Sequence, residues 1–105
     1  MVINYQTFEQ YENNQLSEIH VYYQKDKVEQ NFEKMFCKKY DINEISHDIQ
    51  SLYESELSDH INEVELSIYD DIISSLDLTK FKDDVEFHLV PAHTYTTAQF
   101  IIEVV

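Results

Sequence analysis

Five histidines and one cysteine are the side chains of this 105-residue chain that best suit a metal ion. His88 and His93 flank Pro91, so a hairpin turn at the proline would place both imidazoles at one end of a hairpin. Cys37 falls opposite the apolar positions of its predicted helix, where an unpaired cysteine needs another layer of structure or a ligand. This pattern allows a structural Zn²⁺ site of Cys37, His88 and His93, completed by His20 or a carboxylate. The alternative interpretation is that these are unrelated polar residues near sheet edges.

His60 offers a second group of ligand-type side chains, because Glu56 and Glu63 lie on adjoining turns of the same predicted helix. A histidine with two carboxylates can hold a metal. The simpler interpretation is a histidine at the edge of the core that hydrogen-bonds to Glu56, which would make at most a local pH-sensitive contact.

The sequence lacks the motifs of the common enzyme classes. Gly is absent, and phosphate-binding loops, dinucleotide-binding turns and the nucleophile elbow of hydrolases all need the backbone freedom of Gly. Neither the H-E-x-x-H motif nor the zinc-deaminase motif occurs. The serines follow no catalytic pattern, and a lone cysteine with scattered histidines is no catalytic dyad. We therefore expect a protein that is not an enzyme.

Charge is the most distinctive property of the chain. Seven Lys stand against 21 Asp and Glu, for a net charge of −14. This balance argues against binding to nucleic acid or to an anionic membrane, since both reward clusters of basic residues.

The acids concentrate in one segment that contains no Lys. Exposed helices usually mix signs, because like charges one turn apart destabilise a helix. A solvated helix face is one explanation; a surface for a basic partner is the other. The candidate partner-binding residues are Asp41, Glu44, Asp48, Glu54, Glu56, Asp59, Glu63, Glu65, Asp70, Asp71 and Asp77.

Three features together resemble those of a known protein family. They are this acidic block, the lack of a catalytic motif, and the Asn- and Tyr-rich stretches Tyr11-Glu12-Asn13-Asn14 and Tyr22-Tyr23. The chain resembles the small acidic anti-CRISPR proteins that phages use against type II effector nucleases. The resemblance implies an inhibitor that binds a basic effector surface as a partial DNA mimic and blocks nucleic-acid loading or a conformational step. It also implies a location in the host cell cytosol.

Two β-hairpins are predicted at the ends of the chain. Asn13-Asn14 is typical of a tight turn, and β-branched and aromatic residues dominate on both sides of it. A short helix over 5–12 is the alternative for the first segment. The predicted strands are 2–8, 17–24, 85–89 and 95–105.

Three helices are predicted between the hairpins, because apolar residues recur there at helical spacing. A pair of residues typical of a capping box marks the start of each helix, with the first residue just before the helix and the second in its first turn. The pairs are Asp26 and Glu29, Asp41 and Glu44, and Asn62 and Glu65. The predicted helices are 27–39, 42–60 and 63–78. An alternating strand through Val64, Leu66 and Ile68 is the alternative for part of the third helix.

Together these elements predict an α+β fold over a single domain, residues 1–105, with the order ββαααββ. An antiparallel sheet of four strands would pack one face against about three helices.

The single cysteine permits no intramolecular disulfide, and no signal peptide or membrane span is recognisable, so we expect a cytoplasmic protein. The leading functional hypothesis is a non-enzymatic inhibitor of a nucleic-acid-handling enzyme; the alternative is a small zinc-stabilised structural or adaptor protein whose acidity serves solubility. The sequence does not predict an oligomeric state.

Overall fold

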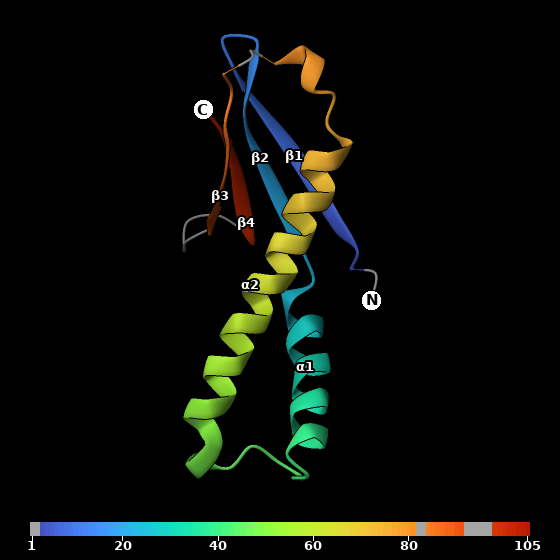
Figure 1. Cartoon of the computed structure of the whole chain (residues 1–105), viewed down its shortest axis with the longest axis vertical. Coiled ribbons are helices and arrows are strands. Elements are labelled where there is room, and N and C mark those ends of the chain that lie inside the picture. Colours follow the sequence, from blue (N-terminus) through green and yellow to red (C-terminus); the bar gives the residue numbers. More distant parts are fainter. Residues whose placement is uncertain (1–2, 82–83, 92–97) are drawn as a thin grey trace. The chain divides into compact units, whose positions relative to one another are not determined.

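A computed structural model of the chain describes residues 3–81, 84–91 and 98–105 (Figure 1). These residues form two compact units: unit 1 comprises Met1–Tyr23 and Leu66–Val105, and unit 2 comprises Gln24–Glu65. The boundary falls within the longer helix. The elements of the described chain are β1 (Tyr5–Glu12), β2 (Gln15–Tyr23), α1 (Lys25–Lys39), the 3₁₀ helix η1 (His47–Ile49), α2 (Gln50–Ser75), the 3₁₀ helix η2 (Leu78–Lys80), β3 (Phe87–Pro91) and β4 (Phe100–Val104).

Unit 1 contains an antiparallel sheet with the strand order β1-β2-β4-β3. Alternate residues of the two central strands face its core, where Val21 pairs with Phe100 and Ile19 with Ile102. All four of these side chains are at most 2% exposed. This period-2 burial explains why β-branched and aromatic residues alternate with polar ones in these strands.

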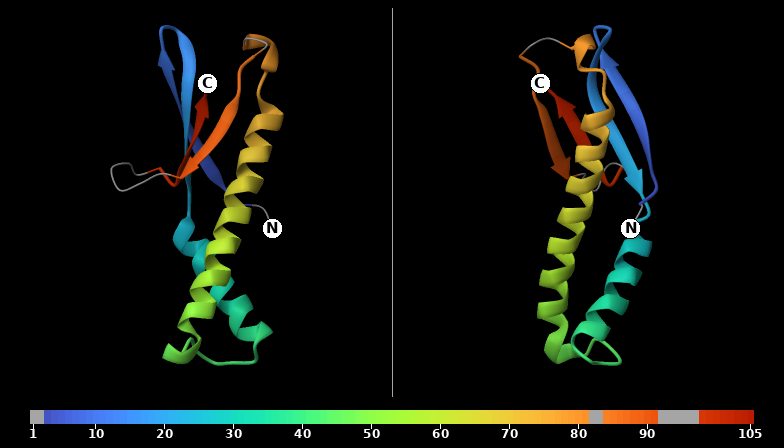
Figure 2. Two further views of the ribbon diagram at one scale, coloured as in Figure 1. Left: turned by 60° about the vertical axis from the view of Figure 1, so that its left-hand side comes forward. Right: turned by 45° about the vertical axis from the view of Figure 1, so that its right-hand side comes forward.

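The last turns of α2 lie beside this sheet, as Figure 2 shows. Ile68 and Ile72 of the helix are buried. The hydroxyl of Tyr69 donates a hydrogen bond of 3.0 Å to the carbonyl oxygen of Phe87 in β3. The helix is thereby joined to an edge strand as well as to the apolar core.

The first hairpin turns at Asn13 and Asn14, as predicted. Their φ angles are 54° and 64°, the left-handed values that a two-residue turn between antiparallel strands requires and that Asn tolerates. The alternative of a short helix over 5–12 is wrong, because β1 (Tyr5–Glu12) occupies this segment. The second hairpin is present as the antiparallel pair β3 and β4.

Unit 2 is held together by aromatic rings of α1 and of the first half of α2. Phe36 is 2% exposed, and its ring centroid lies 5.2 Å from that of Tyr53 and 4.7 Å from that of Tyr40. Phe32 stacks on the imidazole of His60 at 4.9 Å. Aromatic side chains therefore pack between these two helical segments, together with the buried aliphatic side chains Val28, Ile61 and Val64.

The predicted fold with three helices and the order ββαααββ is wrong: the described chain has two α-helices, so its order of strands and α-helices is ββααββ. Residues 41–46 are irregular and η1 precedes α2. The predicted second and third helices are one continuous helix, Gln50–Ser75. The apolar positions Leu57, Ile61, Val64, Ile68 and Ile72 explain the error, because their spacing of three or four residues crosses the supposed break without interruption.

Candidate partner-binding surface

The predicted acidic residues are distributed over both units. Three of the eight in unit 2 precede α2: Asp41 takes a φ of 53° directly after α1, Glu44 lies in the irregular connection and Asp48 in η1. Helix α2 carries the other five. Unit 1 holds the remaining three, Asp70, Asp71 and Asp77.

Glu56 is the acidic residue whose part in the fold is clearest. Lys39 Nζ lies 2.8 Å from its Oε1, and the Tyr40 hydroxyl donates a hydrogen bond of 2.7 Å to its Oε2. These bonds, that of Lys39 first, lower the pKa of Glu56 from its ordinary value, and the same contact with Glu56 raises the pKa of Lys39. Glu56 thus joins the end of α1 to α2.

Glu65 is removed from the candidate surface by its burial. It is 7% exposed, so a partner cannot reach its carboxylate without a rearrangement. Glu65 was among the candidates because it belongs to the Lys-free acidic segment, and membership of that segment says nothing about which face of the helix a residue lies on.

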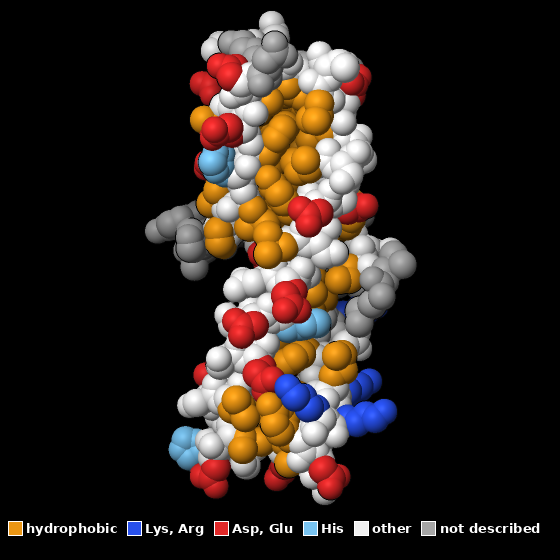
Figure 3. All heavy atoms as spheres, in the orientation of Figure 1, with side chains coloured by type: hydrophobic (Ala, Val, Ile, Leu, Met, Phe, Trp, Pro, Cys, Tyr) orange, Lys and Arg blue, Asp and Glu red, His pale blue; other side chains and the backbone are white. Residues whose placement is uncertain are grey.

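The other predicted binding residues of unit 2 are exposed and share one property. Among the described side chains, none of them makes an ion pair with Lys. Figure 3 shows acidic side chains along α2 and at the connection between the helices, and Lys side chains along α1. We call this set the acidic surface; its members are Asp41, Glu44, Asp48, Glu54, Asp59 and Glu63.

Asp59 and Glu63 form the clearest like-charge pair of the acidic surface. Both are exposed and lie four residues apart on α2, where side chains are neighbours on the helix surface. Glu54, by contrast, accepts a hydrogen bond of 3.0 Å from the side-chain amide of Gln50, one turn earlier. A close pair of carboxylates without a cation presents a local excess of negative charge to solvent.

Two of the three candidate acids in unit 1 have partners within the fold. The hydroxyl of Tyr5 donates a hydrogen bond to the Asp71 carboxylate, and this bond raises the pKa of Tyr5. Asp77 Oδ1 accepts a hydrogen bond of 3.1 Å from the backbone N–H of Thr79 and so caps η2. Asp70 is exposed.

The predicted zinc ligands are not brought together by the described part of the chain. Cys37 is half-buried in unit 2, His88 is exposed in unit 1, and its Nε2 lies 3.1 Å from Glu86. His93 lies outside the described residues, and His20 pairs with Glu18 at 3.3 Å. Within residues 3–81, 84–91 and 98–105, no group of three or more His, Cys, Asp or Glu side chains could hold a metal ion.

His60 also differs from its prediction. The expected hydrogen bond with Glu56 is not the observed arrangement, since Glu56 bonds to Lys39 and Tyr40. The imidazole instead stacks on the ring of Phe32, with an interplanar angle of 22°. His60 is therefore part of the aromatic packing of unit 2.

A pocket in unit 1 was not predicted from the sequence. It has a volume of about 930 Å³ and is formed by the β1–β2 hairpin, the segment from Ser75 to Phe81, the residues before β3, and the end of β4. Its apolar lining residues are Leu16, Leu76, Phe81, Val85, Val104 and Val105. Its acidic lining residues are Glu9, Asp77, Asp84 and Glu86.

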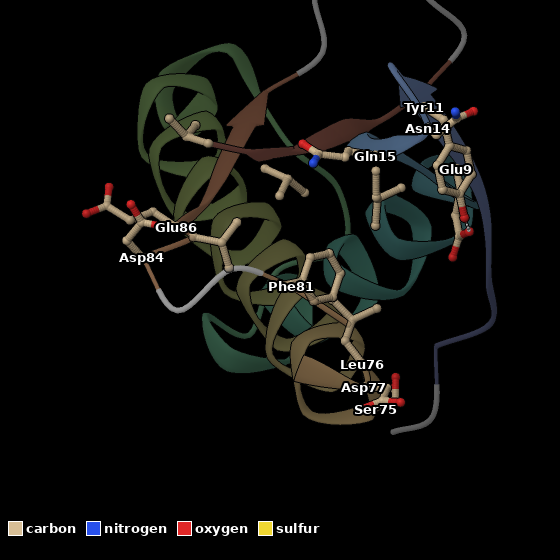
Figure 4. Close-up of a pocket in the computed structure, with 14 residues that line it drawn as sticks. Glu9, Tyr11, Asn14, Gln15, Ser75, Leu76, Asp77, Phe81, Asp84 and Glu86 are labelled. Carbon is tan, nitrogen blue, oxygen red and sulfur yellow. Dashed lines mark hydrogen bonds between the residues drawn. The ribbon is translucent and has the colours of Figure 1, made fainter. Parts of the chain in front are cut away.

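Figure 4 shows how these side chains are arranged: Phe81 lies near the centre, Asp84 and Glu86 lie on one side, Glu9 lies on the opposite side, and Asp77 lies on a third. The pocket therefore has an apolar centre and a rim that carries carboxylates. The β1–β2 hairpin and the end of β4 lie far in the sequence from the lining residues between Ser75 and Glu86, so no local pattern indicates the pocket.

No helix in the described residues is long and apolar enough to cross a membrane. No protein-family model, curated protein or solved structure matches the chain.

Proposed function

We propose that the protein is a non-enzymatic binding protein whose acidic surface occupies a basic, nucleic-acid-binding surface of a partner enzyme. The observation that carries this proposal is that residues 41–63 contain no Lys and that their exposed carboxylates have no Lys partner among the described side chains. The contrast with Glu56, which does have such a partner, supports a separate purpose for the others.

The spacing of the charges suits a protein surface that binds phosphates. Asp59 and Glu63 lie four residues apart on α2, which corresponds to a rise of roughly 6 Å. Phosphates along one DNA strand follow one another at a rise of roughly 3.4 Å. The acidic surface therefore matches the sign of DNA at a wider charge spacing, which makes it a partial mimic.

Electrostatic attraction of this kind would control how fast the complex forms. Oppositely charged surfaces steer diffusional encounter, and salt screens the effect strongly. Inhibition by such a protein would be stoichiometric, because a carboxylate surface competes with nucleic acid for the same basic residues. Blocking the loading of nucleic acid, or a conformational step that depends on it, is the mechanism that fits.

The class of partner follows from the resemblance to anti-CRISPR proteins, so a type II CRISPR nuclease is the first candidate. Restriction and DNA-repair nucleases complete the panel, since their DNA-binding surfaces are also basic. The experiment measures cleavage of DNA by each nuclease with increasing amounts of the protein, at about 50 mM and about 300 mM NaCl. We expect inhibition of at least one nuclease that weakens at the higher salt.

Matched variants locate the interaction on the acidic surface. The double variant Asp59→Asn/Glu63→Gln removes two charges from α2, and Asp26→Asn/Glu33→Gln removes the same two charges from exposed positions on α1. We expect the first variant to lose inhibition and the second to retain it. No inhibition of any nuclease at low salt, or equal loss in both variants, would contradict the proposal.

A further inference from the structure

The two edges of the sheet in unit 1 differ in how well they can pair with a further strand. β3, at one edge, has five residues and ends at Pro91, which has no N–H to donate. The carbonyl oxygen of Phe87 in this strand already accepts the hydrogen bond from Tyr69. β1, at the other edge, has eight residues and contains neither Lys nor Pro, the two residues that commonly protect an edge strand.

β1 is exposed along almost its whole length. Seven of its eight residues are exposed and the first is half-buried; Phe8 is 60% exposed and Tyr11 61%. Figure 2 shows β1 at the border of the sheet, and no strand in the described part of the chain pairs with its outer side. The irregularity in its pairing with β2 comes from an extra residue of β2, Ser17, so β1 itself is regular. Alternate residues of such a strand direct their N–H and C=O groups outward, where another strand can pair with them.

The sequence of β1 is nearly palindromic about Phe8. Residues 5–11 read Tyr-Gln-Thr-Phe-Glu-Gln-Tyr, and only Thr7 and Glu9 break the symmetry. Two copies of this strand, antiparallel and related by a twofold axis at Phe8, would place residues of the same type opposite each other. These pairs are Tyr5 with Tyr11, Gln6 with Gln10, and Phe8 with Phe8. Because aromatic pairs stabilise antiparallel strands, β1 is complementary to itself, and this property selects a second copy of the chain over an unrelated strand.

The charges of β1 favour the same register. The strand carries two acidic residues, Glu9 and Glu12. With the axis at Phe8, Glu9 lies opposite Thr7 and Glu12 opposite Asn4, so no two carboxylates face each other. A register centred on Glu9 would place its carboxylate opposite that of the second copy, and like charges directly opposite each other destabilise a pair of strands.

We propose that two copies of the chain pair through β1 in the register centred on Phe8 and so join their sheets into one. The ring of Phe8 packs edge-on against Tyr22, with the ring centroids 5.3 Å apart. The second copy brings the same two rings to the axis, which covers the exposed side of Phe8 with aromatic surface. The assembly closes at two copies, because each chain contributes one β1 edge and the opposite edge ends at Pro91.

Sedimentation equilibrium of the full chain tests the proposal, at protein concentrations from about 10 µM to about 1 mM. One pair of strands is a small interface, so the dimer should dissociate at the lower end of this range. We expect the average mass to rise from 12.6 kDa toward twice that value. The dimer should be tighter at about 500 mM than at about 50 mM NaCl, because each copy carries a net charge of −14 and salt screens the repulsion between them.

A matched pair of Lys substitutions locates the interface. Phe8→Lys places two positive charges at the axis and removes the central aromatic contact, so it should weaken the dimer at least about tenfold. His88→Lys introduces the same side chain at an exposed position of the other edge strand, β3. This control should change the dissociation constant by less than about twofold, and circular dichroism checks that both variants keep the fold.

Cysteine cross-linking tests the register by a route that does not depend on Phe8→Lys. In a Cys37→Ser background, the thiol of Phe8→Cys lies opposite its own copy, where a disulfide can form. The thiol of Gln10→Cys lies opposite Gln6, and its copy is four residues away along the strand, at roughly 13 Å. We expect oxidised glutathione to cross-link Phe8→Cys at least about tenfold faster than Gln10→Cys.

Three outcomes would each overturn the proposal. They are a chain that stays monomeric up to 1 mM at high salt, equal weakening by Phe8→Lys and His88→Lys, and equal rates of cross-linking for the two cysteine variants. The proposal is independent of the proposed function, because Phe8→Lys leaves the acidic surface of unit 2 unchanged. The two also respond to salt in opposite directions, so failure of one can be distinguished from failure of the other.

Discussion

The like-charge pair of Asp59 and Glu63 makes a prediction that runs against the usual effect of mutation. The substitution Glu63→Lys should raise the free energy of unfolding, although most substitutions lower it. Both residues are exposed on α2, four positions apart, and Glu63 lies far from either end of the helix. Glu and Lys have similar helix propensities, so the change acts through charge alone.

The expected magnitude follows from the helix geometry. Removing a like-charge pair at this spacing recovers about 0.2–0.5 kcal/mol, and an acid followed four residues later by a Lys adds a similar amount. The sum is about 0.4–1 kcal/mol, or about 2–5 °C in melting temperature for a domain of this size. Glu63→Gln removes the repulsion without adding an attraction, so it should give about half of this gain.

Urea unfolding followed by far-ultraviolet circular dichroism measures the change at neutral pH. The gain should be largest at about 50 mM NaCl and should shrink at about 1 M, where charges on the surface are screened. The same substitution should weaken inhibition of the partner enzyme. A loss of stability at low salt would refute the reasoning, because it would mean that Glu63 supports the fold.

Two further predictions concern the packing of unit 2. Phe36→Ala should lower the free energy of unfolding by about 3–5 kcal/mol, because its ring is 2% exposed and packs between Tyr40 and Tyr53; a loss below about 1 kcal/mol in urea unfolding would contradict this packing. Glu56→Gln should destabilise the protein at neutral pH and progressively less in acid. The pKa of Glu56 is lowered in the fold from an ordinary 4.5, so its stabilisation is present above that value and is lost as the pH falls through the folded pKa. Urea unfolding at a series of pH values checks this, and a difference from the unmodified chain that stays constant with pH would count against the bond with Lys39.

The four strands and their antiparallel pairing were predicted correctly, although β1 is Tyr5–Glu12 and not 2–8. Asn13 and Asn14 adopt the left-handed backbone that their side chains tolerate, and a turn of two residues then sets the pairing of the strands on either side. Ile19 and Val21 alternate with polar residues and face the core as this alternation requires. These signals are local, so they can be recognised without knowing the tertiary structure.

The predicted helix 27–39 agrees closely with α1 (Lys25–Lys39), but the boundaries of the other two predicted helices were wrong, because capping pairs are weak signals in an acid-rich chain. Asp26 lies in the first turn of α1, and the N-cap is Gln24, whose side chain makes no capping bond. Asp41 follows α1 with a φ of 53°, and Asn62 lies inside α2. With 12 Glu in 105 residues, an acid three positions after Asp or Asn arises readily by chance. The uninterrupted apolar stripe was the better guide.

The candidate sites could be predicted from the sequence only in part, because they depend on contacts between distant residues. Which carboxylates are free depends on tertiary contacts: Lys39 and Tyr40 reach Glu56 across 17 and 16 residues of sequence. The pocket of unit 1 combines residues as distant as Glu9 and Val105. Neither arrangement has a local pattern, whereas the excess of acids between residues 40 and 79 is visible in the sequence itself.

The separation of charges within unit 2 bears on whether its acidity serves solubility alone. Solubility requires net charge but gives no reason to sort it by sign, and yet α1 carries Lys25, Lys27, Lys34, Lys38 and Lys39 while residues 40–65 carry no Lys. Interspersed charges of both signs cancel beyond roughly a Debye length, about 10 Å in 0.1 M salt, whereas a surface of one sign keeps the field that steers a basic partner. Substitution at Glu63 distinguishes the two purposes. If the acidic surface serves a partner, Glu63→Lys raises stability and lowers inhibition together; if it serves solubility alone, stability rises and inhibition is unchanged.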